Sequence, residues 1–226
     1  MASTSARAVP IAWLAGIALL AMLAIAGASV PGWHGLHLLA KPATTIAIIA
    51  MALRLHGELP RYRSLVIAGL CLGLVGDVLL MLPREWAFMG GLGSFLLGHL
   101  AYLQAWRLRG PWFAPRWPFA LYALVCAGVL AWLWPHLPPG LRGPVAAYVL
   151  VIGAMAAQAL ATWRTRRGRA TAFAAWGGAA FVVSDTVLAV DRFVQPFAGA
   201  MAILLASYWV AQALIALSID DAAGDR

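Results

Sequence analysis

Eight long apolar runs, separated by short polar stretches, dominate this sequence and constrain what it can fold into. A hydrocarbon layer of about 30 Å is crossed by roughly 20 residues of α-helix, which is close to the length of each run. Proline and glycine fall between the runs, where they commonly end helices. We therefore predict an all-α, polytopic membrane protein of eight spanning helices, at about 10–28, 37–55, 64–82, 86–106, 117–134, 144–163, 170–190 and 197–218.

The composition agrees with a membrane domain and leaves no separate soluble part. Hydrophobic residues make up 63% of the chain and charged residues 11%, whereas soluble domains carry about 25% charged residues. We predict a single integral membrane domain over residues 1–226. The first run follows Arg7 and could pass for a signal peptide, but seven further spans make a retained first helix the simpler interpretation.

The basic residues alternate along the chain in a way that predicts orientation. On one side of the membrane they total 12, against three (Arg84, Arg142 and Arg192) on the other. The 12 are Arg7, Arg54, Arg61, Arg63, Arg107, Arg109, Arg116, Arg164, Arg166, Arg167, Arg169 and Arg226. Cytoplasmic loops carry the excess of Lys and Arg, so both termini are expected in the cytoplasm, in a bacterial inner membrane. The net charge of +8 is thus explained by topology, and no nucleic-acid partner is predicted.

The third and seventh predicted helices resemble each other. The stretch from Gly69 through Asp77 aligns with the stretch from Gly177 through Asp185 at an offset of 108 residues. In the helices that follow, His99 aligns with Tyr208 at an offset of 109. Four helices separate the equivalent elements, so the two halves would run parallel, as a 4+4 duplication about an axis along the membrane normal.

Three ionisable residues lie inside apolar runs, where a charge is costly and by default suggests function. They are Lys41, Asp77 and Asp185. Counted from the helix ends, all three lie in the outer part of the membrane, Asp77 about 8 Å from the end of its helix. Two acids and one base at one depth can partly neutralise each other. The alternatives are structural: Lys41 could extend to the interface, and the two Asp could pair with it.

Other polar side chains share helix faces with these three. Each has a structural alternative as a packing histidine, an interfacial aromatic or a helix-to-helix hydrogen bond. The candidates for substrate contact are Thr45, His99, Tyr102, Ser184, Tyr208 and Gln212. His34 and His37 are spaced like a weak ligand pair, but no third ligand is nearby and no metal site is predicted.

These residues also carry a resemblance to the YhhN-like family of integral membrane lysoplasmalogenases. The matching stretches are Lys41-Pro42, Gly76-Asp77, the series Phe88, Gly91, Phe95, His99 and Tyr102, the run from Gly178 through Ser184-Asp185 to Asp191 and Phe193, and Tyr208 with Gln212. No single piece is specific, but their order and spacing fit from about residue 38 to 218, and only 110–165 carries no matching motif.

The resemblance implies an enzyme that cleaves the vinyl ether bond of lysoplasmalogen-like lysophospholipids to a fatty aldehyde and a glycerophospho-alcohol. Such hydrolysis needs an acid to protonate the alkene and a base to activate water, roles that suit Asp77 and Asp185, with no cofactor required. The pair leaves open which Asp is the acid, and the oligomeric state is not indicated. The alternatives are a transporter or flippase that uses Lys41 and the Asp pair as a relay, or a non-catalytic scaffold.

Overall fold

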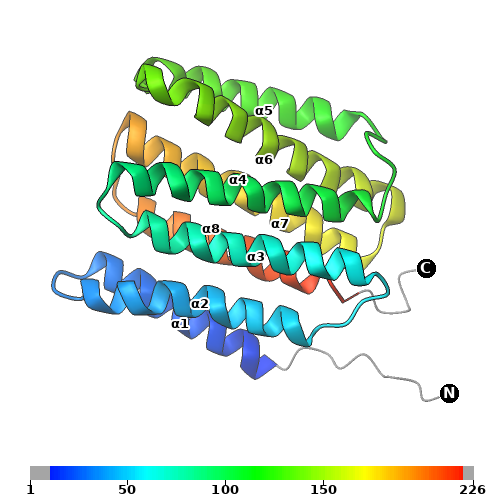
Figure 1. Ribbon diagram of the computed structural model, residues 1–226, viewed down its shortest axis with the longest axis horizontal. Helices are drawn as coiled ribbons and strands as arrows, with labels where there is room; N and C mark the ends of the chain where they lie inside the picture. The colour runs from blue at the N-terminus through cyan, green and yellow to red at the C-terminus, as the bar shows by residue number, and fades with distance from the viewer. Residues whose placement is uncertain (1–10, 221–226) are drawn as a thin grey trace.

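A computed structural model of the chain describes residues 11–220, which form an all-helical bundle (Figure 1). Its helices are α1 (Ile11–Ser29), α2 (His34–Arg54), α3 (Pro60–Leu80), α4 (Glu85–Arg107), α5 (Trp117–Leu133), the 3-10 turn η1 (Trp134–His136), α6 (Pro139–Arg166), α7 (Arg169–Ala189), the π turn η2 (Val190–Val194) and α8 (Ala200–Leu217). Eight of them, some extended by these turns, are long and apolar enough to cross a membrane. The predicted fold class is confirmed.

Several helices begin earlier than the sequence predicted, because proline starts a helix well. Pro60 and Pro139 each occupy the first turn of α3 and α6, where the missing N–H would have no intrahelical partner. Pro42 lies inside α2, which continues through it. Membrane helices tolerate such a proline when neighbouring groups satisfy the freed backbone carbonyl. Lys41 therefore lies about two turns inside α2, deeper than the single turn that a start at residue 37 would give.

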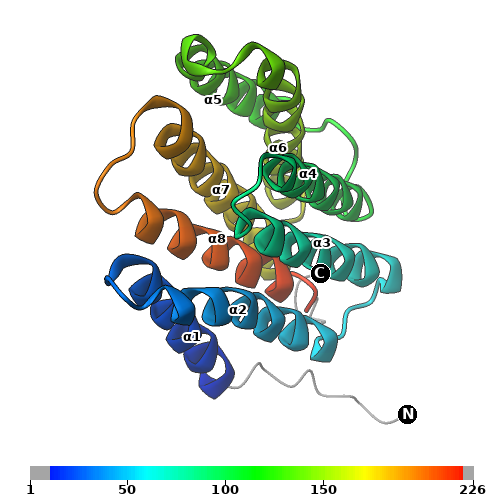
Figure 2. The same cartoon turned by 60° about the vertical axis from the view of Figure 1, so that its left-hand side comes forward.

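Consecutive helices pack as antiparallel hairpins, and α6 and α8 join the hairpins together. The pairs are α1 with α2, α3 with α4, α5 with α6, and α7 with α8. Helix α8 also packs against α1, α2 and α3, while α6 also packs against α4 and α7. Figure 2, turned by 60° from Figure 1, shows α8 between the α1/α2 hairpin and α7, and α5 at the edge of the bundle.

The start of α1 and the end of α8 lie at the same end of the bundle (Figure 1). The connections α2–α3, α4–α5 and α6–α7 are at this end, and so are the arginines that they carry. Arg84, Arg142 and Arg192 are at the opposite end, on the α3–α4, α5–α6 and α7–α8 sides. Arg7 and Arg226, which entered the charge count, lie outside the described residues. Which end faces the cytoplasm stays a prediction.

The helix contacts have the form that a 4+4 duplication would produce. The α3/α4 hairpin corresponds to α7/α8, and the packing of α8 on α2 corresponds to that of α4 on α6. Gly69 and Gly177 occupy equivalent positions, and both are buried against the next helix of their half. The duplication itself remains a prediction.

Candidate functional site

A cavity of about 270 Å³ lies among four helix ends, at the end of the bundle opposite the arginine-rich connections. It is bounded by the start of α2, the end of α3, the end of α7 and the start of α8. Its walls are formed by His34, His37, Leu38, Lys41, Asp77, Leu80, Met81, Phe95, Ser184, Asp185, Leu188, Met201, Leu204, Leu205 and Tyr208. All three ionisable residues that the sequence placed in the outer layer of the membrane therefore line one cavity.

Lys41 and Asp77 form a buried ion pair on one wall of this cavity. The Lys41 Nζ lies 3.5 Å from Asp77 Oδ1 and 3.5 Å from the backbone oxygen of Asp77. Lys41 is 8% exposed and Asp77 is 2% exposed. A buried charge is tolerated when it is paired and hydrogen-bonded, so each residue needs the other.

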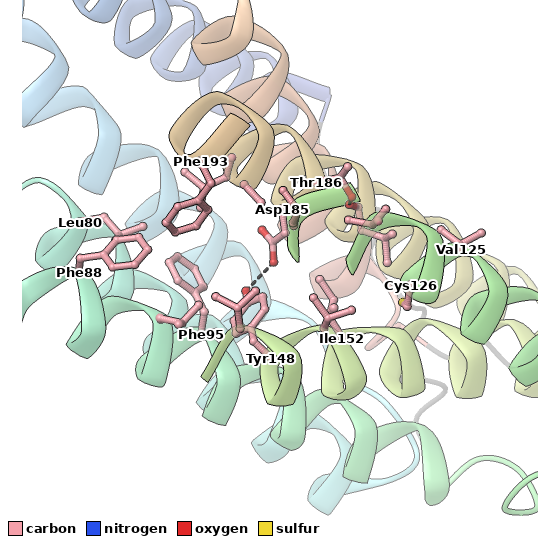
Figure 3. Close-up of a pocket in the computed structure, with 18 residues that line it drawn as sticks. Leu80, Phe88, Phe95, Val125, Cys126, Tyr148, Ile152, Asp185, Thr186 and Phe193 are labelled. Atoms are coloured by element: carbon pink, nitrogen blue, oxygen red, sulfur yellow. Dashed lines mark hydrogen bonds between the residues drawn. The ribbon is translucent and has the colours of Figure 1, made fainter. Parts of the chain in front are cut away.

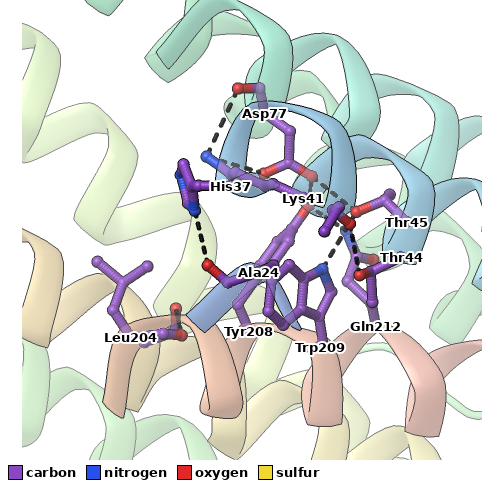
Figure 4. A network of polar contacts seen from close by, with 12 residues as sticks. Ala24, His37, Lys41, Thr44, Thr45, Asp77, Leu204, Tyr208, Trp209 and Gln212 are labelled. Carbon is purple, nitrogen blue, oxygen red and sulfur yellow. Dashed lines mark hydrogen bonds and ion pairs between the residues drawn. The ribbon is translucent and has the colours of Figure 1, made fainter. Parts of the chain in front are cut away.

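Two further donors hold the other oxygen of the Asp77 carboxylate (Figure 4). Thr45 Oγ1 and the Tyr208 hydroxyl both donate to Asp77 Oδ2, each at 2.8 Å. Behind Tyr208, Gln212 Nε2 donates to the Tyr208 hydroxyl at 2.8 Å, and Tyr102 donates to Gln212 Oε1 at 2.8 Å. This chain of hydrogen bonds fixes both the position and the orientation of the Asp77 carboxylate.

Asp185 lies in a different environment, on α7. The Tyr148 hydroxyl of α6 donates to Asp185 Oδ2 at 2.5 Å, and His99 Nε2 lies 3.5 Å from the same oxygen. His99 Nε2 is also 2.9 Å from the Tyr148 hydroxyl. Because that hydroxyl gives its only proton to Asp185, His99 acts as the donor to Tyr148. His99 Nδ1 is buried without a hydrogen-bond partner among the described residues.

The side chains proposed from sequence divide into two groups in space. Lys41, Asp77, Ser184, Asp185 and Tyr208 line the cavity. Thr45, His99, Tyr102 and Gln212 are not among its lining residues. Thr45 and Gln212 donate hydrogen bonds to the lining residues Asp77 and Tyr208. Tyr102 reaches the cavity only through Gln212, and the hydrogen bond of His99 goes to Tyr148, which donates to Asp185.

Ser184 has a structural contact as well as its place on the cavity wall. Its Oγ donates to the Leu204 backbone oxygen of α8 at 3.2 Å, and so joins α7 to α8.

Tyr148 is the residue of the site that the sequence analysis missed. It lies on α6, within the stretch where no motif was matched, and a single tyrosine in an apolar helix gave no sign of its partner. Trp209, whose Nε1 donates to Thr45 Oγ1 at 3.3 Å, was missed as well.

His37 lines the cavity, and its Nδ1 pairs with the Ala24 backbone oxygen at 2.9 Å. Within residues 11–220, no three His, Cys, Asp or Glu side chains gather as metal ligands.

A second, apolar chamber, shown in Figure 3, adjoins the first cavity and shares Asp185 with it. Its free volume is about 70 Å³, and it lies among α4, α5, α6 and α7. The residues around it are Leu80, Phe88, Leu92, Phe95, Val125, Cys126, Val129, Leu133, Val145, Tyr148, Val149, Ile152, Val182, Asp185, Thr186, Leu188, Ala189 and Phe193. Asp185, Leu80, Phe95 and Leu188 line both spaces.

These features define a polytopic α-helical membrane protein with a cluster of two carboxylates, a lysine and tyrosines at one end of its helix bundle. The YhhN family model matches residues 36–219, so the chain belongs to the YhhN family. The resemblance seen in the sequence motifs is thereby confirmed.

Relatives of known name are found in mammals and bacteria. The chain is 32% identical over 194 residues to the pig (Sus scrofa) protein named lysoplasmalogenase TMEM86B, covering 84% of this chain and 76% of that protein. It is 35% identical to human lysoplasmalogenase TMEM86B, over 70% of this chain and 64% of that protein. It is 33% identical to a Mycobacterium bovis lysoplasmalogenase, over 70% of this chain and 62% of that protein. No solved structure matches significantly.

Proposed function

We propose that this protein hydrolyses the vinyl ether bond of lysoplasmalogen-like lysophospholipids within the membrane. The observation that carries the proposal is the joint placement of Asp77 and Asp185 on one cavity, in a chain whose relatives are named lysoplasmalogenase. The products would be a fatty aldehyde and a glycerophospho-alcohol.

The cavity suits the polar part of such a substrate. Lys41 Nζ faces it beside Asp77, and His34 and His37 line its wall on the same helix. These groups can donate hydrogen bonds to a phosphate, and the positive charge of Lys41 attracts it, while the hydrocarbon chain stays among apolar side chains. The position near one end of the bundle matches the depth at which a lysophospholipid carries its glycerol.

Hydrolysis begins with a proton delivered to the alkene carbon that does not bear the oxygen. This gives an oxocarbenium ion at the other alkene carbon, to which water adds while losing a proton to a base. The resulting hemiacetal collapses: its hydroxyl gives its proton to the deprotonated acid, the bond between carbon and glycerol oxygen breaks, and that oxygen takes the proton held by the base, so aldehyde and alcohol leave. One water molecule is consumed, and the acid and the base are restored.

The surroundings of the two carboxyl groups favour different roles in this sequence. Asp77 faces Lys41, Thr45 and Tyr208, three donors that stabilise an ionised carboxylate. Asp185 faces Tyr148 and, at 3.5 Å, His99, has no lysine beside it, and borders the apolar chamber where an alkene would lie. We therefore assign Asp185 as the acid that protonates the alkene and Asp77 as the base that accepts the proton of water.

Transport, the alternative considered from the sequence, draws no support from the helices around Lys41. Transporters commonly place their sites near the bilayer midplane, between interrupted helices. Helix α2 continues through Pro42 without interruption, and the cavity lies among helix ends.

The test is aldehyde release by purified protein in detergent from a long-chain lysoplasmalogen. A transporter needs two compartments and would give no product there. We expect release by the unmutated protein, and loss of about 10²–10⁴-fold in Asp77→Asn and in Asp185→Asn, the usual contribution of acid–base groups. Equal elution volume and melting temperature would show that the variants fold. Release by Asp185→Asn at the unmutated rate would remove that residue from the chemistry.

A further inference from the structure

We propose that the apolar chamber among α4, α5, α6 and α7 is the binding site for the hydrocarbon chain of the substrate, specifically for the carbons next to the vinyl ether. This inference rests on the proposed function and extends it. It gives the substrate one orientation, with its headgroup in the cavity beside Lys41 and its chain beyond Asp185.

The first support is that the two spaces are adjacent. Both are lined by Asp185, Leu80, Phe95 and Leu188, so only these side chains stand between a headgroup in the first cavity and a chain in the chamber. The polar cavity holds Lys41 and Asp77, while the chamber extends away from them toward α5. The bond at the junction of headgroup and chain would then lie at Asp185, the carboxyl group that both spaces share.

The second support is the chemistry of the chamber wall. Apart from Asp185, its oxygen-bearing side chains are Tyr148 and Thr186. Tyr148 donates to Asp185, and Thr186 donates to the Val182 backbone oxygen at 2.7 Å, so both hydroxyl protons are already used. A space lined in this way offers water too few partners, and cavities of this kind take up apolar ligands.

The third support is the volume of the chamber, which limits the length of hydrocarbon chain that it can hold. The free volume of about 70 Å³ is about a quarter of the 270 Å³ of the first cavity. It therefore holds only a short stretch of chain, and the rest leaves toward the bilayer. Helix α5 forms the outer wall and is held mainly by α6 and the short turns η1 and η2. We expect bulk near the vinyl ether to matter more than total chain length.

A filling substitution tests this site through kinetics. Val129→Phe adds a ring at the chamber wall, and Leu124→Phe adds the same ring on the outward face of α5, where Leu124 is 74% exposed. The two substrates are a long-chain lysoplasmalogen and an analogue whose alkenyl group ends at the double bond with a methyl group.

We expect Val129→Phe to raise KM for the long-chain substrate by about tenfold or more, because added bulk in a packed site is unfavourable. Its effect on the short analogue should be several times smaller, and Leu124→Phe should match the unmutated protein on both substrates. An equal loss on both substrates in Val129→Phe would contradict the proposal.

A binding measurement on the unmutated protein covers the case in which Val129→Phe does not fold. The probe is a saturated alkyl lysophospholipid with a photoreactive diazirine a few carbons from the ether. It has no alkene to protonate and is therefore not hydrolysed. After irradiation in nanodiscs, we expect cross-links at the lining positions within 125–133 and 145–152. Cross-links confined to outward positions such as Leu124 and Leu150, which is 70% exposed, would overturn the proposal.

The two outcomes separate this inference from the proposed activity. Cross-links in the chamber without aldehyde release from any lysoplasmalogen would support the chain site and reject the hydrolysis. Aldehyde release with cross-links only on the outward face would support the hydrolysis and reject the chain site.

Discussion

The two carboxylates that line the cavity differ in the donors that surround them, although the sequence places them in stretches that resemble each other. Asp77 accepts hydrogen bonds from Thr45 and Tyr208 and pairs with Lys41. Asp185 accepts a hydrogen bond from Tyr148 and has His99 at 3.5 Å. The asymmetry arises because α8 brings a tyrosine to Asp77 and α4 brings a histidine to Asp185. A pair of equivalent acids is thus given unequal surroundings, which is what a division into acid and base requires.

Tyr148 should act as a positioning residue for Asp185. In Tyr148→Phe the hydrogen bond to the carboxyl group is lost while the ring remains. Asp185 becomes charged as it gives up its proton, and a hydrogen bond to a charged group is worth about 1.5–3 kcal/mol, so we expect kcat to fall roughly 10- to 100-fold with KM little changed. Tyr122→Phe on α5 is the matched control, since Tyr122 does not line either space. An unchanged kcat in Tyr148→Phe would show that the contact with Asp185 does not assist turnover.

Lys41 should be needed for stability as long as Asp77 is ionised. Lys41→Met leaves a buried carboxylate without its cation, a change that typically costs about 3–5 kcal/mol, so the melting temperature in detergent should fall clearly. Neutralising the partner in Lys41→Met/Asp77→Asn should restore most of the lost stability without restoring activity. A double variant that melts as low as Lys41→Met would contradict the pairing.

Sequence reasoning found the ionisable members of the site because charge inside an apolar run is visible without any structure. It also placed Lys41, Asp77 and Asp185 at a common depth, since the rise per residue of a helix fixes height. It could not separate Tyr208, which lines the cavity, from Gln212, which lies behind it. That distinction depends on how each helix is rotated against its neighbours, and packing decides the rotation.

At the scale of helices, α3 lets bulky side chains of its neighbours come close to its backbone. A methyl group at Gly69 would overlap the Tyr102 ring, and one at Gly76 would lie 2.6 Å from the Phe95 ring. At Gly73 it would lie 2.5 Å from Gln212 Nε2 and 3.2 Å from the Tyr208 hydroxyl. Small residues along one face allow this approach in membrane helices generally. The glycines of α3 therefore make room for the chain of hydrogen bonds that ends at Asp77.

Gly73→Ala should accordingly impair activity by moving Gln212 and Tyr208 away from Asp77. We expect a loss of aldehyde release of roughly tenfold, comparable to the loss of one hydrogen bond to a charged group. Gly128→Ala on α5 is the control, because a methyl group there meets no neighbouring atom within 4 Å. Full activity in Gly73→Ala would indicate that these side chains adjust without cost.

Each carboxylate of the site is completed by the opposite half of the chain. Asp77 on α3 receives Tyr208 from α8, and Asp185 on α7 faces His99 from α4. His99 and Tyr208 are the residues that the internal alignment pairs with each other. If the duplication is correct, superposing residues 37–106 on 144–218 should place α3 on α7 and bring these two positions together. Because Tyr208 from the second half contacts Asp77 and His99 from the first half faces Asp185, neither half alone would form the site.

The number of helices was predictable because each span is long and apolar, whereas several helix starts were not. Pro60 and Pro139 lie before the predicted helix starts at about residues 64 and 144, and in the structure they begin the helices α3 and α6. Proline excludes a helix on its N-terminal side more strongly than on its C-terminal side, so it punctuates a sequence without saying which residue starts the next helix. The internal duplication stays a prediction at this scale.

For the molecule as a whole, the cavity and most of the basic residues lie at opposite ends. The cavity is formed by residues near the α1–α2, α3–α4 and α7–α8 connections, and the arginine-rich connections α2–α3, α4–α5 and α6–α7 are at the other end. If the arginine-rich end faces the cytoplasm, the site opens toward the non-cytoplasmic leaflet.

Reporter fusions test the orientation first. A reporter that is active only outside the cytoplasm should be inactive when fused after Arg226 and active when inserted at Gln195, between η2 and α8. The opposite pattern would reverse the orientation, and with it the leaflet that supplies the substrate.

The same geometry predicts that hydrolysis is sided. Lysophospholipids cross a bilayer slowly because the headgroup must leave water, so substrate added to one side first reaches one leaflet. Right-side-out vesicles should release aldehyde soon after lysoplasmalogen is added outside, whereas inside-out vesicles from the same cells should lag. Detergent, which removes the distinction between leaflets, should bring both to the same rate, and vesicles with Asp185→Asn should stay inactive throughout. Equal initial rates before detergent would mean that both leaflets reach the cavity, and a faster rate in the inside-out vesicles would mean that it opens to the cytoplasmic leaflet.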